Sequence, residues 1–150
     1  MKLGVCWMTT KEYLQQPYNI HRKVKLLTER VETIRADMLS VKSPKLKEVM
    51  VQTSLSNDGI DRLIAKADEI IAEIQADINN LLDLYTTITL QIDGMPEVTK
   101  AERQQREVLY RRYLLYQRWE RIAADMDVST RYVYIVHGDA LRSFSKLYKI

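Results

Sequence analysis

Residues 119–137 read Trp119-Glu-Arg-Ile-Ala-Ala-Asp-Met-Asp-Val-Ser-Thr-Arg-Tyr-Val-Tyr-Ile-Val-His137, and this stretch predicts two helices that cross steeply at a turn. Ala123 is small where the two backbones must meet, Asp127 tolerates the left-handed φ of the turn, and Ser129 can cap the second helix. The expected core positions are Ile122, Met126, Val128, Val133 and Val136. A helix-turn-helix of this kind presents the first turns of its second helix outward, where they can enter a major groove.

Sequence features that predict further helices lie on both sides of this stretch. Thr99 and Glu102 match a capping box and predict a helix that runs to about Leu115. A short helix over 119–126 and a long helix from Ser129 to about Leu147 follow. The expected inner face of the long helix consists of Val133, Val136, Ala140, Leu141, Phe144 and Leu147, and Trp119 is also expected in the core.

Two heptad seams precede this C-terminal region, and each alternates spacings of four and three. The connection over 43–58 is too short for a parallel return, so an antiparallel helical hairpin is expected. Excess Lys and Arg on the first helix and excess Asp and Glu on the second favour this pairing. The fold class is therefore predicted as all-α, with a hairpin unit over 1–98 and a helix-turn-helix domain over 99–150. The seams are Ile20, Val24, Leu27, Val31, Ile34, Met38 and Val41, then Ile60, Ile64, Ala67, Ile71, Ile74, Ile78, Leu81, Tyr85, Ile88 and Ile92.

Leu63, Ile70 and Leu84 widen the apolar face of the second helix beyond a two-stranded seam. Two alternatives could cover this dimer-or-packing face. Either residues 10–17 and the C-terminal domain fold back over it, or a second copy of the chain forms a homodimer. In both cases the seam residues Ile34 and Ile74 are expected to be buried.

The composition and charge of the chain indicate which classes of function suit it. The 150 residues carry a net charge of +3, but residues 99–150 alone hold 11 basic and 6 acidic side chains, for a net +5. This basic third coincides with the expected helix-turn-helix, as phosphate binding requires. Cys6 alone cannot form an internal disulfide, which suits a reducing cytoplasm, and no apolar run is long enough to span a membrane. Met8 is a second plausible start, which would make residues 1–7 an extension.

Enzyme chemistry finds little support in the sequence. His21 and His137 lie on different segments without further ligands at metal-binding spacing, so each is expected at the surface or in helix packing. The chain has no Gly-rich phosphate loop and no Gly-x-Ser-x-Gly elbow. We therefore expect no catalytic residues, no metal and no cofactor.

The runs Arg106–Tyr113, Trp119–Ala123, Val128–Val133 and Ala140–Arg142 resemble region 4 of sigma-70-type transcription factors. The whole chain, with Lys11–Leu14 and Val133–Leu141, is similar to a family of small phage and prophage proteins related in layout to phage late-gene transcription regulators. The resemblance implies binding to double-stranded DNA through the second helix, contact with host RNA polymerase, and a place in the bacterial cytoplasm. The candidate DNA-binding residues are Arg118, Arg121, Ser129, Thr130, Arg131, Tyr132, Tyr134, Ile135 and Arg142.

The residues expected on the exposed face of the second helix leave two functions open. Only Arg131 is charged where sigma-like sequences are rich in Arg, Glu and Gln, so it is the one candidate for bidentate base reading. Arg118 also stands where such motifs usually have a Ser or Thr cap. One hypothesis is a DNA-binding transcription regulator, favoured by the net +5 and the motif spacing. The other is a protein-interaction adaptor that binds RNA polymerase or another phage protein, favoured by Tyr132, Tyr134 and Ile135.

Overall fold

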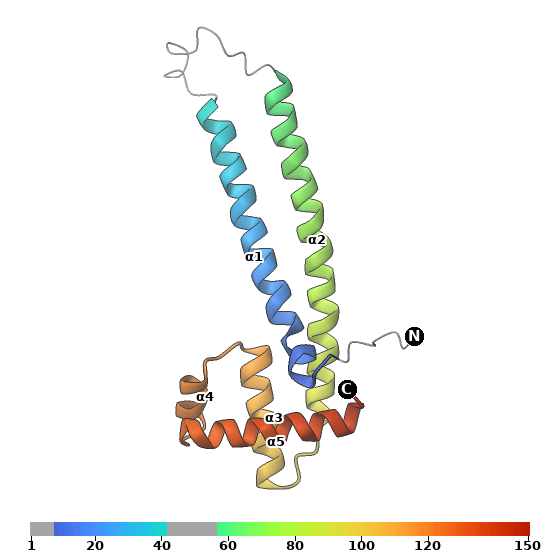
Figure 1. Ribbon diagram of the computed structural model, residues 1–150, viewed down its shortest axis with the longest axis vertical. Helices are drawn as coiled ribbons and strands as arrows, with labels where there is room; N and C mark the ends of the chain where they lie inside the picture. Colours follow the sequence, from blue (N-terminus) through green and yellow to red (C-terminus); the bar gives the residue numbers. More distant parts are fainter. Residues whose placement is uncertain (1–7, 42–56) are drawn as a thin grey trace, which may run out of the picture. The chain divides into compact units, whose positions relative to one another are not determined.

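The structure is a computed structural model that describes residues 8–41 and 57–150, and these residues are all-α with no strand. The expectations for residues 1–7, and for most of the connection over 43–58, lie outside the described residues. The described elements are α1 (Thr10–Val41), α2 (Asn57–Asp93), α3 (Lys100–Leu109), the π-helical turn η2 (Tyr110–Leu114), α4 (Trp119–Asp125) and α5 (Thr130–Tyr148) (Figure 1).

The chain divides into two units, and the division does not follow the predicted boundary after residue 98. The hairpin unit comprises Ile20–Asn80, and the split unit joins Met1–Asn19 to Leu81–Ile150. The segment over 10–17 is the start of α1 rather than a separate helix, since α1 continues through Pro17. Pro17 is fully buried and lacks the N–H that would bond to the carbonyl of residue 13.

The hairpin unit is held by one apolar cluster between α1 and α2. Val31 and Ile34 of α1 pack with Ala67 and Ile70 of α2, and all four are buried. The partly buried residues Leu27, Met38, Leu63 and Ile74 pack around them. The Lys23 ammonium lies 2.7 Å from a carboxylate oxygen of Glu73 and 2.8 Å from one of Asp77. Earlier residues of α1 thus meet later residues of α2, so the helices run antiparallel as predicted (Figure 1).

The register of the predicted α2 seam is partly wrong. Ile64 and Ile71 are exposed, whereas Leu63 and Ile70 pack against α1. Both series have the heptad spacing, but adjacent residues on a helix point about 100° apart, so only one series can face the partner. Val31 and Ile34 of α1, rather than residues 10–17 or the C-terminal domain, therefore pack with Ile70 and with the partly buried Leu63. The other seam prediction is confirmed for Ile34, while Ile74 is only partly buried.

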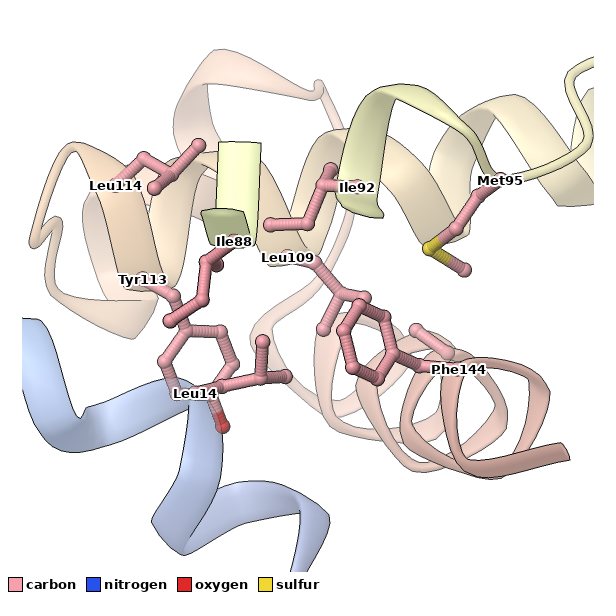
Figure 2. Packing of buried hydrophobic residues seen from close by; sticks show 9 residues of the cluster. Leu14, Ile88, Ile92, Met95, Leu109, Tyr113, Leu114 and Phe144 are labelled. Carbon is pink, nitrogen blue, oxygen red and sulfur yellow. The ribbon is translucent and has the colours of Figure 1, made fainter. Parts of the chain in front are cut away.

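The split unit has a core to which both ends of the described chain contribute. Leu14 from α1 and Ile88 and Ile92 from α2 are fully buried together with Leu109 and Phe144 (Figure 2). The Tyr13 hydroxyl donates to Oε1 of Gln91 at 2.9 Å, which ties the first turns of α1 to α2. Leu84, the third residue predicted to widen the α2 face, is partly buried in this unit.

The helix that begins at the Thr99 cap changes its winding near its end. Thr99 and Glu102 form the predicted capping box, and regular α-helix continues to Leu109. The following turn is π-helical, with the Leu115 N–H donating to the Tyr110 carbonyl at 3.1 Å. Tyr116 then takes a left-handed φ of 53°, which reverses the chain toward α4. Such π-helical turns are rare and are frequently found at functional sites.

Candidate nucleic-acid interface

The turn between α4 and α5 has the local geometry that the sequence predicts. Asp127 adopts a left-handed φ of 53°, and the Val128 N–H donates to the Ala123 carbonyl at 3.0 Å. The Ser129 hydroxyl caps α5 by accepting from the Tyr132 N–H at 3.2 Å. At the start of α4, Arg118 provides no side-chain cap, as its residue type implies. These contacts fix where α5 begins relative to α4.

A small core joins α4, the turn and α5 to α3. Val108, Ile122, Ala123, Val133 and Val136 are buried together, and Trp119, Met126 and Val128 pack against them. All five apolar positions predicted for the helix-turn-helix therefore lie in or against this cluster. One prediction for the inner face of α5 is wrong, because Leu147 is 47% exposed. Leu147 lies in the last turn of α5, after Phe144, which is the last fully buried residue of the helix.

The first turns of α5 present a mixed surface to solvent. Arg131, Tyr132, Tyr134 and Ile135 are exposed, while Thr130 is half-buried. The Tyr132 hydroxyl donates to Oε1 of Gln104 at 3.0 Å, and the Tyr134 ring lies 5.0 Å from the Trp119 ring between centroids. The two tyrosines are thus anchored to α3 and α4. Arg131 and Ile135 are exposed on α5, and Arg131 makes no ion pair within the described residues.

The four candidate arginines differ in their partners. Arg121 pairs with Asp125 at 3.0 Å, and Arg142 pairs with Asp139 one turn before it on α5. Within the described residues, Arg118 and Arg131 make no ion pair. Exposed ion pairs contribute little, about 0–1 kcal/mol, so Arg121 and Arg142 can exchange their carboxylates for phosphate. The structure therefore leaves Arg118 and Arg131 as the arginines most available to a ligand.

Asp125, which was not predicted as a site residue, is a carboxylate that connects α4 to η2. Asp125, at the end of α4, accepts from Arg111 of η2 at 3.0 Å and from Gln117 at 3.3 Å. Arg111 also pairs with Glu107 at 2.8 Å. A network of this kind fixes the end of α4 against η2. The pairs Glu107–Arg111 and Arg121–Asp125 have i,i+4 spacing, but no local spacing connects Asp125 to Arg111 and Gln117.

His137 is a helix-packing residue, which is one of the two positions expected for it. Its side chain is 8% exposed, and its Nε2 shares a hydrogen bond of 2.9 Å with the Tyr113 hydroxyl. Its ring packs edge-on against the Trp119 ring, with 4.8 Å between the two ring centroids. Burial, with smaller contributions from the charges of Lys11 and Arg112, lowers the pKa of His137 to about 4. His137 is therefore neutral at physiological pH.

The depressed pKa of His137 should make the folded protein sensitive to acid. The group titrates at 6.5 when unperturbed, so between pH 6.5 and pH 4 the unfolded chain binds a proton that the folded chain rejects. The free energy of unfolding should then fall as the pH falls, by on the order of 2 kcal/mol between pH 7 and pH 4.5. Urea titrations at several pH values, compared with those of His137→Gln, isolate this contribution.

Tyr113→Phe is the matched control for that comparison. It removes the hydrogen bond but leaves His137 buried, and burial is the main cause of the shift. Its pH dependence should follow that of the unchanged protein. Equal acid sensitivity of His137→Gln and the unchanged protein would show that His137 does not cause the effect.

Two other properties of the described residues bear on the choice of function. No helix in the described ranges is long and apolar enough to cross a membrane. Over residues 8–41 and 57–150, no group of three or more His, Cys, Asp or Glu side chains is placed to hold a metal ion.

Comparisons with known proteins identify no relative on which a function could be based. No family model, no curated protein and no solved structure matches this chain.

Proposed function

We propose that the protein is a DNA-binding transcription regulator that reads double-stranded DNA with the first turns of α5. The observation that carries the proposal is the α4–turn–α5 segment, in which Val133 and Val136 are buried while Arg131 faces solvent. A helix anchored on one side and free on the other is the arrangement that enters a major groove in helix-turn-helix proteins. The net charge of +5 over residues 99–150 supports the same interpretation.

In this proposal the arginines have different roles. Arg131 reads a base edge, since it is the charged residue among the exposed positions of the first turns of α5. Arg118 contacts phosphate, and Arg121 and Arg142 join it by exchanging their carboxylate partners. Together with the resemblance to phage proteins, this suggests a regulator that acts without cofactor or catalysis in the bacterial cytoplasm. Host RNA polymerase would be its protein partner.

Replacing Arg131 tests the proposed base contact. On a site selected from random duplexes, Arg131→Ala should weaken binding by about 1–3 kcal/mol and relax the preference at one base pair. Arg62→Ala removes the same charge from the exposed surface of the hairpin unit and serves as the control. Gel-shift titrations with the selected site and its single-base variants measure both quantities. Unchanged affinity and unchanged sequence preference in Arg131→Ala would refute the assignment.

A protein-interaction adaptor is the second candidate function. Tyr132, Tyr134 and Ile135 expose apolar surface beside Arg131, and aromatic residues with Arg are enriched at protein interfaces. The first experiment is a gel-shift titration of the full chain with random duplex DNA at low salt, where phosphate contacts are strongest. No shift under these conditions, together with binding to purified RNA polymerase, would favour the adaptor. A shift that weakens steeply with added salt would favour the regulator.

A further inference from the structure

A hollow of about 260 Å³ lies within the split unit, and neither Arg131 nor Ile135 is among the residues that line it. Three cationic side chains line it, Lys11 of α1, Arg112 of η2 and Arg118 before α4. No carboxylate is among the described residues that line it. The rest of the wall is polar or aromatic, and it includes Gln15 and Trp119. The hollow therefore combines positive charge with side chains that can donate hydrogen bonds.

Each of the three cations is brought to the hollow by a different local feature. Lys11 and Gln15 are four residues apart on α1, so they share one face of that helix. The π-helical turn carries Arg112, which donates to the Gln117 carbonyl at 2.8 Å and lies 4.5 Å from the centre of the Trp119 ring. Arg118 follows directly, in extended conformation, at the cap of α4. These contacts hold the guanidinium of Arg112 in place before any ligand arrives.

The positive charge of the hollow is uncompensated by the surrounding structure. Several other arginines of the split unit pair with carboxylates, as Arg106 does with Asp93 and Glu97. Among the described residues, no such pair is made by the three cations of the hollow. His137 lies behind Trp119 and adds no charge at neutral pH. Three cations gathered without an anion repel one another, so an anion that enters between them is stabilised.

We propose that this hollow binds the phosphate group of a phosphorylated ligand. A phosphate offers several acceptor oxygens to the fork of an arginine and to the point charge of a lysine, which matches Arg118, Arg112 and Lys11. The aromatic wall is suited to the organic part of a phosphoester. The volume is below the range typical of drug-sized ligands, so a compact ligand is required. Arg118 is shared with the phosphate contact of the proposed function, but this inference does not rest on base reading by α5.

Calorimetric titration of the full chain with inorganic phosphate and with adenosine monophosphate tests the proposal. Both should bind saturably, and Lys11→Gln and Arg118→Gln should each weaken binding about tenfold or more, as the loss of a charge-assisted hydrogen bond implies. Lys100→Gln, an exposed residue at the start of α3 outside the hollow, should bind like the unchanged protein. Circular dichroism checks that each variant keeps its helix content. No saturable binding of either compound, or no effect of both pocket variants, would overturn the proposal.

A competition arm separates the two sources of phosphate and keeps the test independent of the proposed function. If a short duplex displaces adenosine monophosphate, and Lys11→Gln weakens duplex binding, the phosphate belongs to a DNA backbone. If the duplex does not compete, the hollow takes a free phosphoester. Arg131→Ala should leave binding of adenosine monophosphate unchanged in either case. If the full chain binds adenosine monophosphate but gives no gel shift with duplex DNA, the proposed DNA-binding function is contradicted and the phosphate proposal is not.

Discussion

Phe144→Ala should destabilise the split unit by about 3–5 kcal/mol, the cost of removing a buried aromatic ring and leaving a cavity. Phe144 is fully buried among residues from α1, α2 and α3, including Leu14, Ile92 and Leu109 (Figure 2). Its ring also lies 4.8 Å from the ring of Tyr148 and 6.3 Å from that of Tyr13, between centroids. Closely packed neighbours relax only partly into such a space, so the truncation is expected to leave a cavity.

The matched control is Leu147→Ala, three residues later on the same helix. Leu147 is 47% exposed, so its truncation should cost less than about 1 kcal/mol. Urea denaturation followed by tryptophan fluorescence, to which Trp119 of the same unit contributes, compares the two variants. Similar losses of stability for Phe144→Ala and Leu147→Ala would contradict the core assigned to α5.

Ile70→Ala should destabilise the hairpin unit by about 2–5 kcal/mol, whereas Ile71→Ala should cost less than about 1 kcal/mol. The two residues are adjacent and chemically identical, but Ile70 is 3% exposed and Ile71 is 43% exposed. Ile70 packs with Val31, Ile34 and Ala67, so its truncation leaves a cavity between the two helices. The pair therefore tests the register of α2 with no change in composition between the variants.

Amide hydrogen exchange over residues 27–38 of α1 is the suitable measurement for this pair. It reports the opening of the hairpin itself, which matters because the chain has two units that need not unfold together. Exchange in this segment should accelerate strongly in Ile70→Ala and little in Ile71→Ala. The reverse order would restore the register with Ile64 and Ile71 inside.

The features that the sequence predicts correctly are those set by neighbouring residues. The caps at Thr99 and Ser129 and the left-handed Asp127 depend on contacts within three or four residues, and all three occur as expected. The apolar core of the α4–turn–α5 segment follows for the same reason, since short spacing fixes which side chains meet. Antiparallel pairing of the hairpin follows from the short connection.

The features that escape prediction depend on which distant surfaces meet. Two heptad series overlap on α2, and only the position of α1 decides that Ile70 rather than Ile71 is inside. The candidate phosphate hollow joins Lys11 to Arg112 and Arg118, about a hundred residues later, and no local pattern connects them. The π-helical turn that carries Arg112 is also not predictable from the sequence, because its residues have ordinary helical propensity.

The split unit has a consequence for how the chain folds as it is made. Leu14 lies in the same core as Phe144, and the Thr10 hydroxyl donates to the Ile150 carbonyl at 3.3 Å. During synthesis the hairpin segment emerges complete, and its contacts can form early. The first turns of α1 can meet Ile88 and Ile92 earlier, but their contacts with α5 form only after α5 has left the ribosome, and closing so long a loop slows folding. Until then the apolar side chain of Leu14 has no partner from α5. The interval before α5 emerges therefore leaves this core incomplete and open to aggregation or to capture by a chaperone.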